Sequence, residues 1–180
     1  KALAKSKILH VQDDLEHWFE IGSEQEINLG NLDVILMRKD PPFDMEYIYT
    51  SYILDRAKLA GTLIVNRPQA LRNMNEKAYT AWFSNCSPPT LITQSMQEMK
   101  VFLSKYNRVV VKPLDGMGGH SIFVVSQDDK NANVIFETLT NNGRLFAMIQ
   151  AYIPEISDGD KRILLLDGEP LGAILRVHAE

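Results

Sequence analysis

The spacing of apolar residues along the first half of the chain switches between strand-like and helix-like periods. Residues 33–37 form a short, almost wholly apolar run, which is typical of a buried parallel strand, and residues 62–65 form a second. Between them, apolar residues recur at helical spacing from 44 to 60, and Gly61 follows where a helix would end. This spacing predicts a helix with one apolar face, made by Met45, Ile48, Tyr49, Tyr52, Ile53 and Ala57.

A second helix is expected directly after residues 62–65. Asn66 and Pro68 suit a helix start. The buried stripe predicted for this helix comprises Leu71, Met74, Ala78 and Trp82. Strand, helix, strand and helix joined by short links predict a parallel sheet with right-handed crossovers. The pattern changes after Pro88 and Pro89, so a lobe boundary is expected between about residues 75 and 89.

The second half of the chain predicts a mixture of helices and hairpins. Ser95 and Glu98 form a capping-box pattern that opens a helix. Residues 109–113 and 121–125 flank a glycine-rich turn and predict an antiparallel hairpin. The remaining expected elements are a helix from 133 to about 142, a strand at 146–150 and a hairpin of strands 162–166 and 171–177.

Composition and charge narrow the class of protein. The 45% hydrophobic and 23% charged residues are ordinary globular values, and a net charge of −4 argues against an electrostatic nucleic-acid binder. The single cysteine, Cys86, has no neighbouring histidine and is predicted to be an inert thiol in a reducing compartment. No apolar run reaches the ~18–20 residues that cross a bilayer. These features predict a cytoplasmic protein without a membrane or nucleic-acid partner.

The sharpest chemical signal is the glycine-rich segment that follows residues 109–113. Gly116, Gly118 and Gly119 leave backbone N–H groups unobstructed, so the loop can form a concave nest for phosphate oxygens. Lys112 ends the strand that enters the loop and can supply a cation to the same phosphates. The alternative is a flexible hairpin loop with a surface lysine. The spacing is neither a Walker loop nor a dinucleotide fingerprint, because no Gly-Lys-Ser/Thr follows and the next element is a strand.

Three further segments have both a chemical and a structural interpretation. Residues 150–155 run from an apolar strand into a proline-bounded connector, which suits a purine slot or an ordinary strand end. In residues 156–162, Lys161 and Arg162 could serve transferring phosphoryl groups in a cleft, or belong to a solvated loop. Arg38 lies just beyond the carboxyl end of a predicted strand and suits a substrate carboxylate. The alternative is an ordinary charged loop beside a rigid turn.

The histidines and carboxylates show no metal-ligand spacing, so no metal site is expected within this chain. His10, His17 and His178 are isolated and are expected to be structural or exposed. His120 differs from them because it sits in the glycine-rich loop.

Taken together and in order, four segments resemble the bacterial glutathione synthetase family of ATP-grasp ligases. They are residues 32–44, 75–77, 112–119 and 158–162, within a resemblance that extends from about residue 32 to 170. The resemblance implies an ATP-grasp fold of α/β and α+β elements with a truncated Rossmann-like N-terminal domain. The implied domains are residues 1–74 for the partial Rossmann-like domain, 75–152 for the ATP-grasp lid or N-lobe and 153–180 for the start of the C-lobe.

The same resemblance implies ATP-dependent ligation of glycine to γ-glutamylcysteine through an acyl phosphate, with magnesium or manganese and in a homotetramer. Arg162 would be the catalytic residue that faces the transferring phosphate, and Arg38 would hold the dipeptide. The implied ATP contacts are Lys77, Lys112, Gly116, Gly118, Gly119, Gln150, Ala151, Tyr152, Ile153 and Asp160.

Two departures from the family pattern qualify these expectations. His120 occupies a position where a small residue is expected, which would alter the edge of the lid. The chain also ends at Glu180, before the acidic and asparagine magnesium ligands of the family, and it begins without Met. We therefore expect a fragment that is inactive alone. Two alternatives stay open: another ATP-grasp ligase joining a different carboxylate and amine, or a non-catalytic ATP-binding protein that switches shape.

Overall fold

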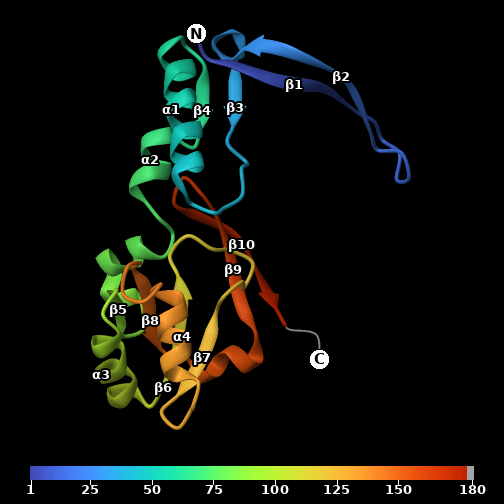
Figure 1. Ribbon diagram of the computed structural model, residues 1–180. Coiled ribbons are helices and arrows are strands. Elements are labelled where there is room, and N and C mark those ends of the chain that lie inside the picture. Colours follow the sequence, from blue (N-terminus) through green and yellow to red (C-terminus); the bar gives the residue numbers. More distant parts are fainter. Residues whose placement is uncertain (178–180) are drawn as a thin grey trace. The chain divides into compact units, whose positions relative to one another are not determined.

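The computed structural model describes residues 1–177, and the chain forms two compact units (Figure 1). The first unit comprises Lys1–Thr80 and Pro113–Ser121, and the second comprises Ala81–Lys112 and Ile122–Glu180. The glycine-rich loop therefore belongs to the first unit, although it interrupts the sequence of the second. His178 lies outside the described residues.

The first unit combines a long antiparallel hairpin with a small parallel sheet. Strands β1 (Leu3–Val11) and β2 (Phe19–Asn28), drawn in blue in Figure 1, form the hairpin, which the sequence pattern did not predict. Strands β3 (Val34–Leu36) and β4 (Leu63–Val65) pair in parallel and are connected through helix α1 (Met45–Leu59). The predicted strand–helix–strand order and its parallel pairing are confirmed.

Helix α1 begins where the sequence predicts but buries a different face. The Asp44 side chain caps the helix by accepting a hydrogen bond from the Tyr47 N–H at 2.8 Å. The inward-facing Ser51 hydroxyl accepts a hydrogen bond from Arg72 of helix α2 (Pro68–Asn73) at 2.9 Å. The same inward side carries Leu54 and Ala57, which belong to the buried apolar cluster of this unit. The buried side chains are Tyr47, Ser51, Leu54 and Ala57, whereas Met45, Tyr49, Tyr52 and Ile53 of the apolar face are exposed.

The second helix is shorter than the sequence predicts. Helix α2 stops before Met74, whose backbone angles (φ −117°, ψ 64°) are not helical. The Asn75 side-chain oxygen accepts hydrogen bonds from the Lys77 and Ala78 N–H groups and starts separate 3₁₀ turns. Trp82 lies in these turns and is exposed. The prediction of one helix with a buried stripe through Trp82 is therefore wrong.

The second unit is built on a four-stranded sheet with the order β5–β8–β6–β7. Its strands are β5 (Thr90–Thr93), β6 (Arg108–Pro113), β7 (Phe123–Ser126) and β8 (Ala147–Ala151). Strands β6 and β7 form the predicted antiparallel hairpin, and β8 confirms the predicted strand near 146–150. Strand β5 pairs antiparallel with β8 and was not predicted.

Helices α3 (Met96–Tyr106) and α4 (Ala132–Leu139) confirm two predicted helices and supply apolar side chains to the core of this unit. Ser95 caps α3 as predicted, because its hydroxyl accepts the Glu98 N–H at 3.3 Å. The Glu98 carboxylate does not return to the Ser95 N–H. It accepts the Thr93 hydroxyl, and Thr93 in turn accepts the Ser95 N–H at 2.9 Å. The core comprises Met99, Leu103, Val109, Val111, Val125, Phe136, Leu139, Ala147 and Ile149.

The predicted C-terminal hairpin is confirmed by strands β9 (Asp160–Leu166) and β10 (Glu169–Arg176), which pair antiparallel. Asp167 and Gly168 between them have φ values of 50° and 87°, as a tight two-residue hairpin turn requires. This hairpin follows directly on the short 3₁₀ turn Pro154–Asp158 at the end of the segment that leaves β8.

Candidate functional site

Five of the residues predicted to contact ATP line one pocket of the second unit. Its volume is about 520 Å³. The predicted residues in its lining are Lys112, Gln150, Ala151, Tyr152 and Ile153. Its other walls are apolar side chains of β6 and β7, together with Pro88 and the turn after β8. Val110 and Lys112 alternate along β6, so they share a face of the sheet and place one ammonium beside an apolar surface.

Backbone contacts fix the end of β8 where this pocket lies. The Ala151 N–H donates to the Pro89 carbonyl at 2.9 Å, and the Tyr152 N–H donates to the Arg108 carbonyl at 3.1 Å. The Arg108 guanidinium also lies over the Tyr152 ring, 4.0 Å from its centre. Ile153 is the next residue, and among the described residues its N–H has no hydrogen-bond partner. An apolar slot that ends in an unpaired backbone donor can bind the edge of a purine ring.

The side chain of Gln150 is engaged within the protein. Its Nε2 donates to the Thr90 hydroxyl at 2.8 Å, which ties β8 to β5. Gln150 is almost completely buried. One of its two amide N–H donors is therefore committed to Thr90, so it could offer a ligand in this pocket its backbone, the second amide N–H and Oε1.

Asp160 and Arg162 lie on β9 and do not line the pocket. Asp160 accepts a hydrogen bond from Arg176 Nε at 3.0 Å and a second from Nη2, in an ion pair across the β9–β10 hairpin. The sequence reasoning did not single out Arg176, although its place opposite Asp160 follows from the hairpin register. Arg162 is exposed, and no ion pair joins it to another residue in the described part of the chain.

Lys77 and Gly116, both predicted phosphate contacts, meet in the first unit. Lys77 Nζ donates to the Gly116 carbonyl and to the Glu76 carboxylate, the latter at 2.9 Å. The Lys77 side chain is only 13% exposed. Gly118 and Gly119 have φ values of 64° and 79°, a backbone region that glycine adopts without strain. Glycine at both positions therefore avoids the backbone strain that a side chain would cause.

The glycine-rich loop also borders a smaller pocket of the first unit, of about 210 Å³. Phe43 and Tyr47 line one side with their rings 5.2 Å apart, and Asp115 and Asn75 contribute polar groups. Arg38, the predicted substrate contact, is exposed and is not part of this lining. The structure does not bring Arg38 together with Lys77 through a direct contact in the described residues.

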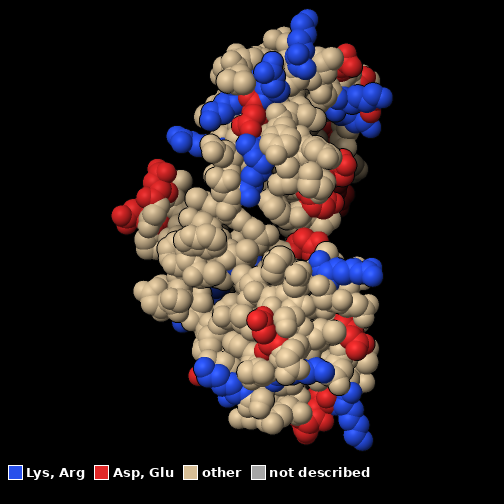
Figure 2. Space-filling model, turned by 60° about the vertical axis from the view of Figure 1, so that its left-hand side comes forward, with Lys and Arg blue, Asp and Glu red and all other residues tan. Residues whose placement is uncertain are grey.

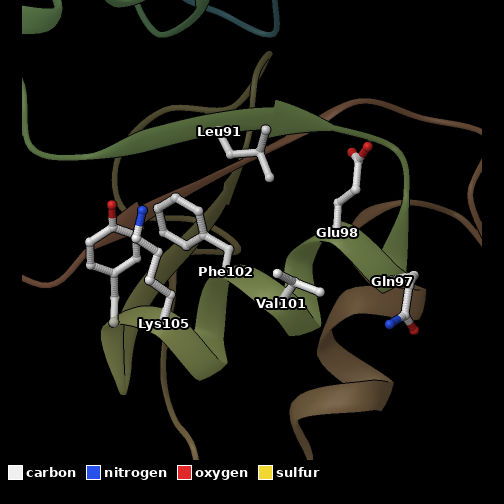
Figure 3. A pocket seen from close by; sticks show the side chains of 7 residues that line it. Leu91, Gln97, Glu98, Val101, Phe102 and Lys105 are labelled. Atoms are coloured by element: carbon white, nitrogen blue, oxygen red, sulfur yellow. The ribbon is translucent and has the colours of Figure 1, made fainter.

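A third pocket, in the second unit, contains none of the predicted site residues. Figure 3 shows an apolar pocket of about 380 Å³, where Phe102 and Val101 of α3 face Leu91 of β5 between Lys105 at one end and Glu98 at the other. Figure 2 shows basic and acidic side chains interspersed over the visible face. Among residues 1–177, no group of three histidine, cysteine or carboxylate side chains could hold a metal ion, and no helix is long and apolar enough to cross a bilayer.

Solved structures with the same arrangement define the class of fold. The chain superposes on D-cycloserine synthetase with a TM-score of 0.66, at 18% identity over 84% of this chain and 54% of that one. It superposes on an ATP-grasp RimK domain protein from Sphaerobacter thermophilus with a TM-score of 0.62, at 18% identity over 82% and 56%. The predicted ATP-grasp fold, with its mixed α/β and α+β content, is confirmed.

Sequence comparison identifies the family within this fold. Residues 1–72 match the family of the prokaryotic glutathione synthetase N-terminal domain. Residues 76–180 match the family of the prokaryotic glutathione synthetase ATP-grasp domain. The chain is 56% identical to glutathione synthetase from Salmonella typhimurium over 171 residues, which cover 95% of this chain and 54% of that protein. The chain belongs to the prokaryotic glutathione synthetase family, and it spans about half the length of the curated relatives it matches.

Proposed function

We propose that the full-length protein containing this chain is an ATP-dependent ligase that joins glycine to γ-glutamylcysteine and so makes glutathione. The cysteinyl carboxylate would attack the γ-phosphorus of ATP, release ADP and become an acyl phosphate. The glycine amine would then attack the acyl carbon and expel phosphate as the new amide forms. Such a reaction needs positioning and charge stabilisation more than covalent work by side chains.

The observation that carries this proposal is the pocket of the second unit. It gathers an ammonium, an apolar slot and the unpaired Ile153 N–H at one end of a rigid sheet. We propose that the slot holds the adenine and that Lys112 contacts a phosphate. Membership of the glutathione synthetase family supports ATP as the nucleotide and small molecules as the co-substrates.

The other predicted roles stay proposals. Lys77 and the loop glycines would contact phosphates, and Arg162 and Asp160 would act beside the transferring group. Arg38 would hold the dipeptide carboxylate through its guanidinium. The described residues contain no cluster that fits magnesium, so the metal ligands are proposed to lie elsewhere in the full-length protein. Homotetramer assembly and a cytoplasmic location are proposed from the family.

The direct test is product formation by the full-length protein given ATP, magnesium, γ-glutamylcysteine and glycine. We expect glutathione, ADP and phosphate in equal amounts, and no glutathione when glycine is withheld. Lys112→Ala should lower kcat/KM about a hundredfold, because one charge that stabilises the phosphates is lost. Lys130→Ala removes an exposed lysine of the same unit that does not line the pocket, and it should leave the rate unchanged.

The alternative functions give different results in the same assay. ADP released with another carboxylate and amine, but not with these substrates, would favour a different ATP-grasp ligase. ATP binding without any turnover would favour a protein that switches shape. Assaying this 180-residue chain in parallel tests the expectation that it is inactive alone, and glutathione made by the chain itself would contradict that expectation.

A further inference from the structure

Three successive carbonyl groups of the glycine-rich loop accept hydrogen bonds from three separate donors of the first unit. The donors come from the segment before α1 and from the turn after α2. The pairs are Asn75 Nδ2 with the Leu114 carbonyl at 3.0 Å, the Phe43 N–H with the Asp115 carbonyl at 3.1 Å, and Lys77 Nζ with the Gly116 carbonyl. The first part of the loop is therefore anchored, while the tip at Gly118 and Gly119 is exposed.

The anchoring decides where the N–H groups of the loop point. In a planar trans peptide the N–H lies opposite the carbonyl. Because the Leu114, Asp115 and Gly116 carbonyls face the anchoring donors, the N–H groups that follow each of them face the other way. Those N–H groups belong to Asp115, Gly116 and Met117, and none has a hydrogen-bond partner among the described residues. Backbone N–H groups of successive residues that have no protein partner are available to an anion.

Asn75 is the one anchor that also fixes Lys77. Its Nδ2 donates to the Leu114 carbonyl, and its Oδ1 accepts the Lys77 N–H at 3.1 Å and the Ala78 N–H at 2.9 Å. We propose that Asn75 is a positioning residue for nucleotide binding, which holds the turn that carries Lys77 and the anchored part of the loop in one arrangement. This inference rests on the proposed function, in which Lys77 and the loop contact ATP phosphates.

The chemistry of the three anchors explains why Asn75 matters most. The Lys77 ammonium is shared between the Gly116 carbonyl and Glu76, and a phosphate competes for the same ammonium. The Phe43 anchor is a backbone N–H and holds only the loop. A primary amide is neutral and is both donor and acceptor, so Asn75 keeps its two connections whether Lys77 faces the loop or a phosphate.

Two substitutions separate the two connections. Asn75→Asp keeps an oxygen that accepts the Lys77 and Ala78 N–H groups but loses the donor to Leu114, because a carboxylate is an acceptor only. Asn75→Ala loses both connections without adding charge. We expect Asn75→Asp in the full-length protein to bind ATP about tenfold more weakly by calorimetry, as the loss of one preorganising hydrogen bond predicts. Asn75→Ala should weaken ATP binding by at least the same factor, because it loses the second connection as well. KM for ATP should rise by the same factor, while kcat changes less than about twofold.

A matched control comes from the same unit. The Asn28 side chain accepts the Gly30 N–H at 3.2 Å, so it caps a short turn as Asn75 does, and among the described residues it makes no hydrogen bond to the loop. Asn28→Ala should bind ATP like the unsubstituted protein. Thermal unfolding of all three variants shows that they are folded during the binding measurement.

The outcomes distinguish this inference from the proposed function. The positioning role is overturned if Asn75→Asp binds ATP as tightly as the unsubstituted protein, or if Asn28→Ala weakens binding as much as Asn75→Ala. ATP binding weakened by about tenfold or more in both Asn75 variants, with no glutathione made by the unsubstituted protein, would retain the positioning role and reject the proposed ligase reaction. No ATP binding by the unsubstituted protein would reject both.

Discussion

Short runs of consecutive apolar residues form strands in both units, but the two units bury them to different degrees. In the second unit Val109 and Val111 of β6 and Ile149 of β8 are completely buried beneath α3 and α4. In the first unit Leu36 of β3 is 63% exposed. Within β3 and β4, Ile64 is the one side chain that is buried. The same strand pattern therefore forms a closed core in the four-stranded sheet of the second unit, whereas it stays partly open in the first unit and in β9, where Leu165 is 63% exposed.

Polar contacts supplement the limited apolar burial in the first unit. Its buried apolar cluster is small and consists of Ala2, Leu29, Leu54, Ala57 and Ile64. Around this cluster the Thr62 hydroxyl donates to the Leu29 carbonyl, and Arg72 joins α2 to Ser51 and Asp55 of α1. Hydrogen bonds contribute less net free energy each than the burial of a large side chain. The comparison teaches that the four-stranded sheet of the second unit depends on packing, whereas the first unit depends more on a few directional contacts.

The largest effect is expected from the core of the second unit. Phe136→Ala should lower the free energy of unfolding by about 3–5 kcal/mol, because it removes a completely buried ring and leaves a cavity. Phe146→Ala is the matched control, since Phe146 belongs to the same unit and is exposed, and it should cost less than about 1 kcal/mol. If denaturant unfolding shows the same loss of unfolding free energy for both variants, the second unit does not depend on this packed core.

A smaller effect is expected where two helices of the first unit are joined by charge. Arg72 donates to Ser51 at 2.9 Å and to Asp55 at 2.7 Å, with 18% of its side chain exposed. Arg72→Met should lower the free energy of unfolding by about 1–2 kcal/mol. This value allows for partial solvent screening of the Arg72–Asp55 ion pair.

The exposed Arg56 of the same helix pair provides the control. Arg56→Met should change the free energy of unfolding by less than about 0.5 kcal/mol. A double-mutant cycle between Arg72→Met and Asp55→Asn measures the coupling directly, and a coupling indistinguishable from zero would show that the two helices are held by something else.

The third prediction concerns one buried hydrogen bond. Thr62 is almost completely buried, and its hydroxyl donates to the Leu29 carbonyl at 2.8 Å. Thr62→Val keeps the shape but removes the donor, so unfolding should become easier by about 1 kcal/mol. Thr50→Val removes a similar bond, from Thr50 to the Glu46 carbonyl, at an exposed site where water replaces it. If chemical denaturation finds the two variants equally stable, burial does not determine how much these hydrogen bonds contribute to the free energy of unfolding.

Local signals in the sequence predicted much of this fold. The capping pattern at Ser95, the glycine-rich hairpin turn after Lys112 and the Asp167-Gly168 turn each specify their structure within a few residues, and each is confirmed. Strands β1 and β2 were missed, because residues 12–18 between them contain no glycine and no two-residue hairpin signal. The buried face of α1 could not be read from spacing, because the residues that contact it come from other segments, such as Arg72 of α2 and Leu29 of the buried cluster.

The candidate site was predictable to a similar extent. Of the pocket lining in the second unit, Lys112 lies on β6 and the predicted residues 150–153 follow one another at the end of β8, so neighbours in sequence are neighbours in the pocket, and their contact with ATP stays a prediction. The sequence pattern singled out Lys77 and not Asn75, although an asparagine whose side chain accepts the N–H two residues later is a recognised turn pattern. Its bond to the Leu114 carbonyl spans 39 residues and carries no signal in the sequence.

The smallest expected effect lies in the turn of the β1–β2 hairpin, where a polar contact again takes the place of packing. Asp14 Oδ1 accepts the His17 and Glu16 N–H groups, both at 2.8 Å. These bonds, that from His17 foremost, lower the pKa of the Asp14 carboxyl below its ordinary value of 3.8. The charged carboxylate therefore favours the closed turn above that ordinary value, and the contribution disappears as the pH falls through the lowered pKa. An NMR titration should show the Asp14 carboxyl titrating below 3.8, with the His17 amide shift following it. Titration at or above 3.8 would mean that the turn is open in solution, and the first unit would then lack one of its directional contacts.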